Sequence, residues 1–104
     1  MRYSLNPVQP DNSVIMTSTS DDGQQEYGRL LGKYDETSRS ITVTHFEVQD
    51  NYKGRNIELN TYAALPTLAL RQLHYTPSVL LGDEIPQDLK KKIEDLMKKA
   101  KFMH

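Results

Sequence analysis

The first half of the chain alternates β-branched, apolar runs with turn-forming residues. Asp22-Gly23 is a dipeptide typical of hairpins, and the polar residues 35–39 give a second turn signal. Residues 1–12 contain two prolines and predict a loosely ordered segment, a short strand at best followed by a loop. The runs between these signals predict an antiparallel meander of three or four strands, with strands at 13–19, 26–34 and 40–48.

The third of these predicted strands contains a slip in its alternation. Ile41 and Val43 point to one face of a pleated strand, whereas Phe46 and Val48 fall on the other. One extra residue near positions 44–45, a β-bulge, would bring all four side chains to the same face. A strand buried on both faces also explains the pattern, so the sequence leaves both interpretations open.

The second half has helical periodicity around a short apolar run. A helix is predicted after Asn56, which can cap it, because apolar residues recur there at three- and four-residue spacing: Tyr62, Leu65, Leu68, Ala69 and Leu73. Pro66 removes one backbone donor, so we expect a kink or a restart of the helix there. Residues 78–81 predict a strand. Pro86 opens a final helix whose apolar stripe is Ile85, Leu89, Ile93, Leu96, Met97 and Ala100.

The order of these elements defines a fold class. A meander followed by helix, strand and helix predicts an α+β fold with a mixed, mostly antiparallel sheet. The last strand can join this sheet through a right-handed crossover. A length of 104 residues fits a single domain.

Charge and composition narrow the function classes. Residues 1–50 carry four Lys or Arg against eight Asp or Glu, and residues 51–104 carry nine against six, for a net charge of −1. This balance argues against nucleic-acid binding, and no apolar stretch approaches the roughly 20 residues of a membrane span. The N-terminus lacks the apolar core of a secretory signal, and the chain has no cysteine, which fits a cytoplasmic protein.

The junction at residues 48–58 is the most informative segment. A strand leads into a polar turn with Gly54 and then into a helix start, where unpaired backbone N–H groups and the helix dipole favour an anion. Lys53 and Arg55 add positive charge. The alternative interpretation is a plain strand-to-helix connection with solvated basic residues.

The run Phe46-Glu47-Val48-Gln49-Asp50-Asn51-Tyr52-Lys53-Gly54-Arg55-Asn56-Ile57 resembles the acetyl-CoA motif of the GNAT superfamily of N-acetyltransferases. In that family a bulged strand leads into a turn, R/Q-x-x-G-x-G/A, whose backbone amides hold the CoA pyrophosphate. The run at 96–102 is similar to the family's helix ending in Tyr-x-x-x-Gly-Phe. The resemblance implies one GNAT-like domain over residues 1–104 and acetyl-CoA as the acyl donor. It also implies pantetheine contacts from Phe46 and Val48, and phosphate contacts from Lys53, Gly54, Arg55, Asn56, Ile57 and Glu58.

Several positions depart from the family pattern. Asn56 stands at the first motif glycine, where Asn is the next best residue for a left-handed backbone. Glu58 stands at the final glycine or alanine, where a carboxylate repels a pyrophosphate. Met97 replaces the tyrosine that often protonates the leaving thiolate, and the chain ends at His104, where most relatives continue into one or two further strands. The resemblance is therefore to a reduced, degenerate member.

A general base for such a reaction is expected on the bulged strand. The family commonly uses a strand carboxylate or a water chain, and Glu47 and His45 are the best-placed candidates. Ordinary solvent-facing strand residues are the alternative interpretation of both. The histidine spacing does not suggest a metal site, and the lysines of the final helix alternate with acidic residues as on a solvated face.

Two functions are consistent with these patterns. One is a CoA-dependent N-acyltransferase that moves an acetyl group from acetyl-CoA to an amine acceptor, a small molecule or a protein, and that is weak or inactive because of the departures. The alternative is a non-catalytic GNAT-fold module that binds a protein partner, such as a bacterial effector or regulator. The polar first 25 residues would suit a secreted effector.

Overall fold

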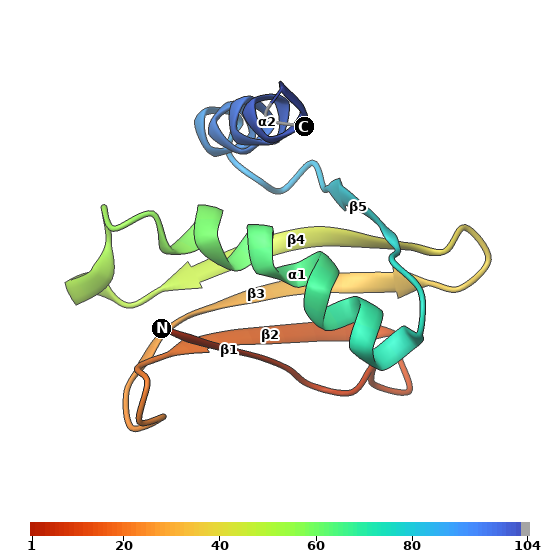
Figure 1. Cartoon of the computed structure of the whole chain (residues 1–104), viewed down its shortest axis with the longest axis horizontal. Coiled ribbons are helices and arrows are strands. Elements are labelled where there is room, and N and C mark those ends of the chain that lie inside the picture. Colours follow the sequence, from red (N-terminus) through yellow and green to blue (C-terminus); the bar gives the residue numbers. More distant parts are fainter. Residues whose placement is uncertain (103–104) are drawn as a thin grey trace.

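Five strands form one mixed sheet with two helices beside it (Figure 1). The computed structural model describes residues 1–102, except for the side chains of Met97 and residues 99–102. The strands lie in the order β1-β2-β3-β4-β5, antiparallel except for β4 and β5, which pair parallel. The elements are β1 (Arg2–Leu5), β2 (Ser13–Thr19), β3 (Glu26–Asp35), β4 (Ser40–Val48), the 3₁₀ turn η1 (Asp50–Tyr52), α1 (Ile57–Leu73), β5 (Ser78–Leu81) and α2 (Gln87–Phe102). The predicted α+β fold is confirmed.

The N-terminal segment contributes a short edge strand. β1 pairs antiparallel with β2, and Leu5 lies opposite Met16. The N-terminal ammonium group also donates to the carboxylate of Asp21 at 2.7 Å. The short strand that the sequence allowed is therefore present, and a connection at residues 6–12 leads from it to β2.

The predicted bulge in β4 is confirmed. His45 pairs with Leu31 and Val43 pairs with Gly32, so Thr44 is an extra residue between two consecutive partners in β3. The extra residue restores the phase of the strand. The less exposed face of β4 therefore carries the same apolar set on both sides of the bulge: Ile41, Val43, Phe46 and Val48.

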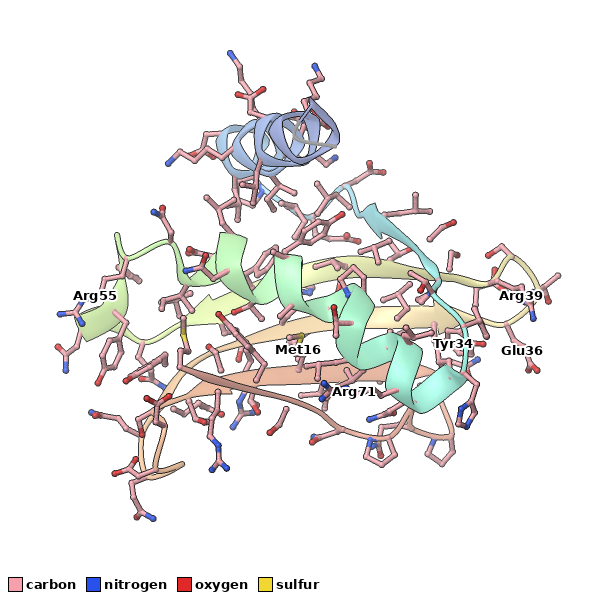
Figure 2. All side chains as sticks on the ribbon, in the orientation of Figure 1. Met16, Tyr34, Glu36, Arg39, Arg55 and Arg71 are labelled. Atoms are coloured by element: carbon pink, nitrogen blue, oxygen red, sulfur yellow. The ribbon has the colours of Figure 1, made fainter. Side chains whose placement is uncertain are left out.

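α1 packs against the inner face of the sheet and closes the core (Figure 1). Met16, which Figure 2 labels, and Leu30 are fully buried between the strands and this helix. α1 supplies Tyr62, Leu65 and Ala69 to the same cluster. α2 lies beyond β5 in Figure 1 and adds Ile93, so one continuous core joins both helices to the sheet.

α1 runs through Pro66 as one helix of 17 residues. The restart considered at this proline does not occur. A proline removes only one hydrogen bond, and the buried side chains before and after it, Tyr62, Leu65 and Ala69, hold both halves of the helix on the same core. Within residues 1–102 no helix combines the length and the apolar character that crossing a membrane requires.

The outer face of the sheet carries charged side chains beside a few apolar ones such as Leu80. Because successive side chains of a strand point to opposite faces, this face carries the exposed side chains of Arg29, Lys33, His45 and Glu47. A buried apolar face and a solvated face with charged side chains are typical of an antiparallel sheet with one side open to water.

An aromatic cluster joins two connections at one end of the sheet. The hydroxyl groups of Tyr34 and Tyr75 share a hydrogen bond, and the Arg39 guanidinium carbon lies 4.4 Å from the centroid of the Tyr75 ring. Tyr34 and Arg39 appear at this end in Figure 2. The Ser78 N–H donates to the Arg39 carbonyl at 3.1 Å. The cluster therefore attaches the start of β5 to the β3–β4 turn.

Replacing Leu30 with alanine is expected to destabilise the chain strongly. Leu30 has no exposed surface, so the change leaves a cavity that costs about 2–5 kcal/mol of unfolding free energy. Leu80→Ala is the matched control, because Leu80 is 52% exposed and should lose less than about 1 kcal/mol. Urea unfolding of both variants measures the difference, and similar losses would contradict the buried position of Leu30.

Tyr34 is expected to make stability depend on alkaline pH. The hydrogen bond that the Tyr34 hydroxyl shares with Tyr75 raises the pKa of Tyr34 from 10.0 to about 12, so the folded chain holds this proton more tightly than the unfolded chain. The resulting stabilisation is complete below about pH 10 and is lost as the pH rises toward 12. The unfolding free energy of the wild type should therefore fall more steeply than that of Tyr34→Phe across this range. Parallel curves in denaturant titrations would refute this linkage.

Candidate functional site

The end of β4 has one open backbone edge. β5 pairs only with residues 40–43 of β4, and the Gly82 N–H closes this pairing by donating to the Val43 carbonyl at 2.7 Å. On the other side, the Gln49 N–H donates to Tyr27 of β3 at 2.9 Å. Backbone groups alternate in direction along a strand. The main-chain groups of Phe46 and Val48 therefore face away from β3, beyond the point where β5 ends.

The turn between β4 and α1 uses two left-handed residues. Gly54 has φ of 84° and Asn56 has φ of 58° and ψ of 32°. Glycine adopts this region without steric cost, and asparagine is one of the few other residues that tolerate it. Asn56 therefore supplies the backbone conformation expected of a motif glycine. Asn56 occupies the N-cap position of α1, as the sequence suggested, but its side chain makes no capping hydrogen bond.

The first amides of α1 have no partners within the described part of the chain. The first helical bond runs from the Asn60 N–H to the Asn56 carbonyl at 3.0 Å. No acceptor is found among residues 1–102 for the three amides before it, those of Ile57, Glu58 and Leu59. Such amides, together with the positive end of the helix dipole, form an anion-binding position.

A cavity of about 290 Å³ lies at this helix start. Residues from the turn and from α1 form one wall, and residues from the first turns of α2 form the other. Both helices thus begin at the same cavity. The lining residues are Gly54, Asn56, Glu58, Leu59, Pro86, Asp88, Leu89 and Lys92.

The structure brings only some of the predicted phosphate contacts to this cavity. Gly54, Asn56 and Glu58 line it. The Ile57 side chain is buried in the core, with only its amide at the helix start. The two basic residues, Lys53 and Arg55, do not line the cavity, and Lys53 forms an ion pair with a neighbouring acid in η1 at 3.0 Å.

Arg55 also lies away from the cavity lining. Its guanidinium carbon is 5.4 Å from the centroid of the Tyr52 ring, a cation–π contact within the turn. Figure 2 shows the Arg55 side chain at the outer end of the molecule. The basic charge expected from this turn is therefore directed to local contacts in this structure.

The two candidate general bases lie on the outer face of β4. His45 Nδ1 is 3.0 Å from Thr44 Oγ1, at the bulge. Glu47 lies opposite Arg29 in the sheet, and Glu26 forms an ion pair with Arg29 at 2.9 Å. The carboxylates of Glu26 and Glu47 raise the pKa of the Arg29 guanidinium. His45 and Glu47 are both exposed, and the cavity lining includes neither.

The α2 wall of the cavity was not anticipated from the sequence. Its lysines were interpreted as a solvated face, yet Lys92 lines the cavity together with Asp88 and Leu89. The available signal was the four-residue spacing of Asp88 and Lys92, which puts both on one side of a helix. The sequence predicts that Met97 replaces a proton-donating tyrosine. The Met97 side chain lies outside the described part of the structure.

Asn56 gives a direct test of the turn geometry. Asn56→Ala should lower the unfolding free energy by about 1–2 kcal/mol, because alanine is strained at a φ of 58°. Asn56→Gly should lie within about 0.5 kcal/mol of the wild type. Asn60→Ala is the control, an exposed position inside α1 with ordinary helical backbone. Equal stability of the Asn56→Ala and Asn56→Gly variants in urea unfolding would argue against a left-handed Asn56.

Three solved structures resemble this chain. A ribosomal-protein-alanine N-acetyltransferase from Brucella melitensis biovar Abortus 2308 matches with a TM-score of 0.60 at 18% identity, over 85% of this chain and 64% of its own. A probable acetyltransferase matches with a TM-score of 0.61 at 11% identity, over 83% and 58%. A glucosamine-6-phosphate N-acetyltransferase from Arabidopsis thaliana matches with a TM-score of 0.57 at 12% identity, over 83% and 59%.

These similarities concern the fold. No family model matches the sequence, and no curated protein sequence matches it. The chain spans less than two thirds of the length of each of the three structures. The chain therefore has a GNAT-like fold, the α+β fold of these acetyltransferases.

Proposed function

We propose that this chain is a CoA-dependent N-acyltransferase that moves an acetyl group from acetyl-CoA to an amine. The acetyltransferase fold supports a transferase of this class. One local observation carries the proposal, the unpaired amides of Ile57, Glu58 and Leu59 at a cavity that follows the end of β4. Unpaired amides at a helix start are suited to phosphate oxygens.

Two features of the described residues suit parts of acetyl-CoA, its phosphates and its pantetheine arm. The amides at the start of α1 suit its phosphates. The open backbone edge at Phe46 and Val48 suits the amides of the pantetheine arm, because an extended chain can pair with a strand edge. When bound, acetyl-CoA supplies an acetyl group activated as a thioester, which an amine can attack.

In this proposal, strand residues near the bulge polarise the thioester carbonyl and accept the proton of the amine. Main-chain N–H groups on the open edge of β4 would polarise a carbonyl oxygen. His45 and Glu47, on the outer face of the same strand, would accept the proton of the amine directly or through water. Methionine cannot donate a proton, so with Met97 at the position of the family's tyrosine, the proton for the leaving thiolate comes from solvent.

Two carboxylates oppose the binding of phosphate. Glu58 and Asp88 both line the cavity and occupy the first turns of α1 and α2. Each carboxylate interacts favourably with its own helix dipole and repels a second anion. We therefore propose a weak affinity for acetyl-CoA, set by these two side chains.

Acetyl-CoA binding tests the function. We expect the ligand to raise the unfolding free energy, by about 2.7 kcal/mol at a concentration one hundredfold above its dissociation constant. Amide chemical shifts should change at residues 46–48 and 54–59. Removal of one carboxylate by Glu58→Gln should strengthen binding about fivefold in calorimetric titration, because the variant keeps the shape of the side chain and removes the repulsion.

Glu36→Gln is the matched control for this charge change. Glu36 is an exposed acid in the β3–β4 turn, at the other end of the sheet from Arg55 in Figure 2, and its variant should bind acetyl-CoA as the wild type does. Absence of stabilisation and of shift changes at millimolar acetyl-CoA, in the wild type and in Glu58→Gln, would remove the acyltransferase proposal. Binding without acetyl transfer to any amine would restrict the function to CoA binding.

A further inference from the structure

The cavity lining contains more negatively charged side chains than positively charged ones. It contains two carboxylates, those of Glu58 and Asp88, and one cationic side chain, that of Lys92. The α1 wall adds unpaired amides to this set. An anionic ligand in the cavity would therefore face Glu58 beside favourable amides on one wall, and Asp88 beside Lys92 on the other.

Lys92 is available to a ligand in a way that Lys90, two residues earlier in α2, is not. Lys90 is mostly covered and lies 3.9 Å from the Asp83 carboxylate. Lys92 is exposed, and within the described part of the chain no acidic group lies within ion-pair distance of it. A lysine carries a compact charge on a flexible stem, which allows it to reach a phosphate group across a cavity of this size.

The position of Lys92 on α2 also separates it from the other lysines of this helix. Four residues after Asp88, it lies on the same side of the helix, one turn further from the helix start. Lys91, the preceding residue, is exposed and does not line the cavity. The two neighbouring lysines therefore have the same charge and different access to the cavity.

We propose that Lys92 is a phosphate-binding residue of this site and that its charge offsets the two carboxylates when a CoA ligand binds. This inference rests on the proposed function, since it names a binding residue of the same cavity. Without Lys92 the charged side chains of the lining are both negative. The unpaired amides of α1 would then have to hold the phosphates against two like charges. Lys92 thus raises the affinity for the donor that the two carboxylates lower.

The test compares neighbouring lysines. Lys92→Ala should weaken the binding of acetyl-CoA about tenfold in calorimetric titration, the effect of losing one charge-assisted contact. Lys91→Ala should stay within about twofold of the wild type, because it removes an equal charge outside the cavity. Lys92→Arg should recover most of the affinity. The loss in Lys92→Ala should also reduce the salt dependence of binding, which a purely structural effect would leave unchanged.

The same titrations with 3′-dephospho-CoA identify the phosphate concerned. A loss seen with acetyl-CoA and absent with the dephospho ligand assigns Lys92 to the 3′-phosphate, and a loss seen with both assigns it to the diphosphate. Equal affinities of Lys92→Ala and Lys91→Ala would overturn the inference while leaving the acyltransferase proposal intact. Failure of the wild type and of Glu58→Gln to bind either ligand would overturn the proposed function itself, and with it this role of Lys92.

Discussion

The candidate site depends on the point where β4 and β5 stop pairing. The pairing ends at Val43, one residue before the bulge at Thr44. Gly82 lies so close to this point that a Cβ atom there would be 3.0 Å from the Val43 carbonyl oxygen. Because the bulge redirects β4 at the same place, the strands separate, and the backbone of Phe46 and Val48 keeps an edge without a neighbouring strand. That edge leads to the cavity between the two helix starts.

The sequence predicted the features that depend on neighbouring residues. The slip between Val43 and Phe46 indicated either a bulge or a strand buried on both faces, and the bulge is the interpretation that the structure confirms. The left-handed turn follows from Asn56, one of the few residues that tolerate that conformation. The fold class follows from the change of periodicity after the meander. These features are encoded within a few residues of where they occur.

The second wall of the cavity could not be predicted in the same way. It joins the start of α1 to residues of α2 some thirty positions later, and their approach depends on how both helices pack on the core. The contacts of the basic residues in the turn could not be predicted for a related reason. Lys53 and Arg55 interact with Asp50 and Tyr52, contacts that residue spacing alone does not specify. Lys92 differs from both, because the sequence suggested a solvated surface lysine and the packing of α2 puts it in the cavity lining.

The aromatic cluster at the other end of the sheet determines how long the open edge of β4 is. Tyr75 is held by Tyr34 and Arg39, and the chain then enters β5 with Ser78 opposite Ser40. A displacement of β5 by one position would move the point of strand separation by about 3.3 Å and reverse its side chains between the two faces. The tyrosine pair therefore helps to fix, from the far end of the sheet, the register of β5 and with it the length of β4 backbone that β5 leaves unpaired.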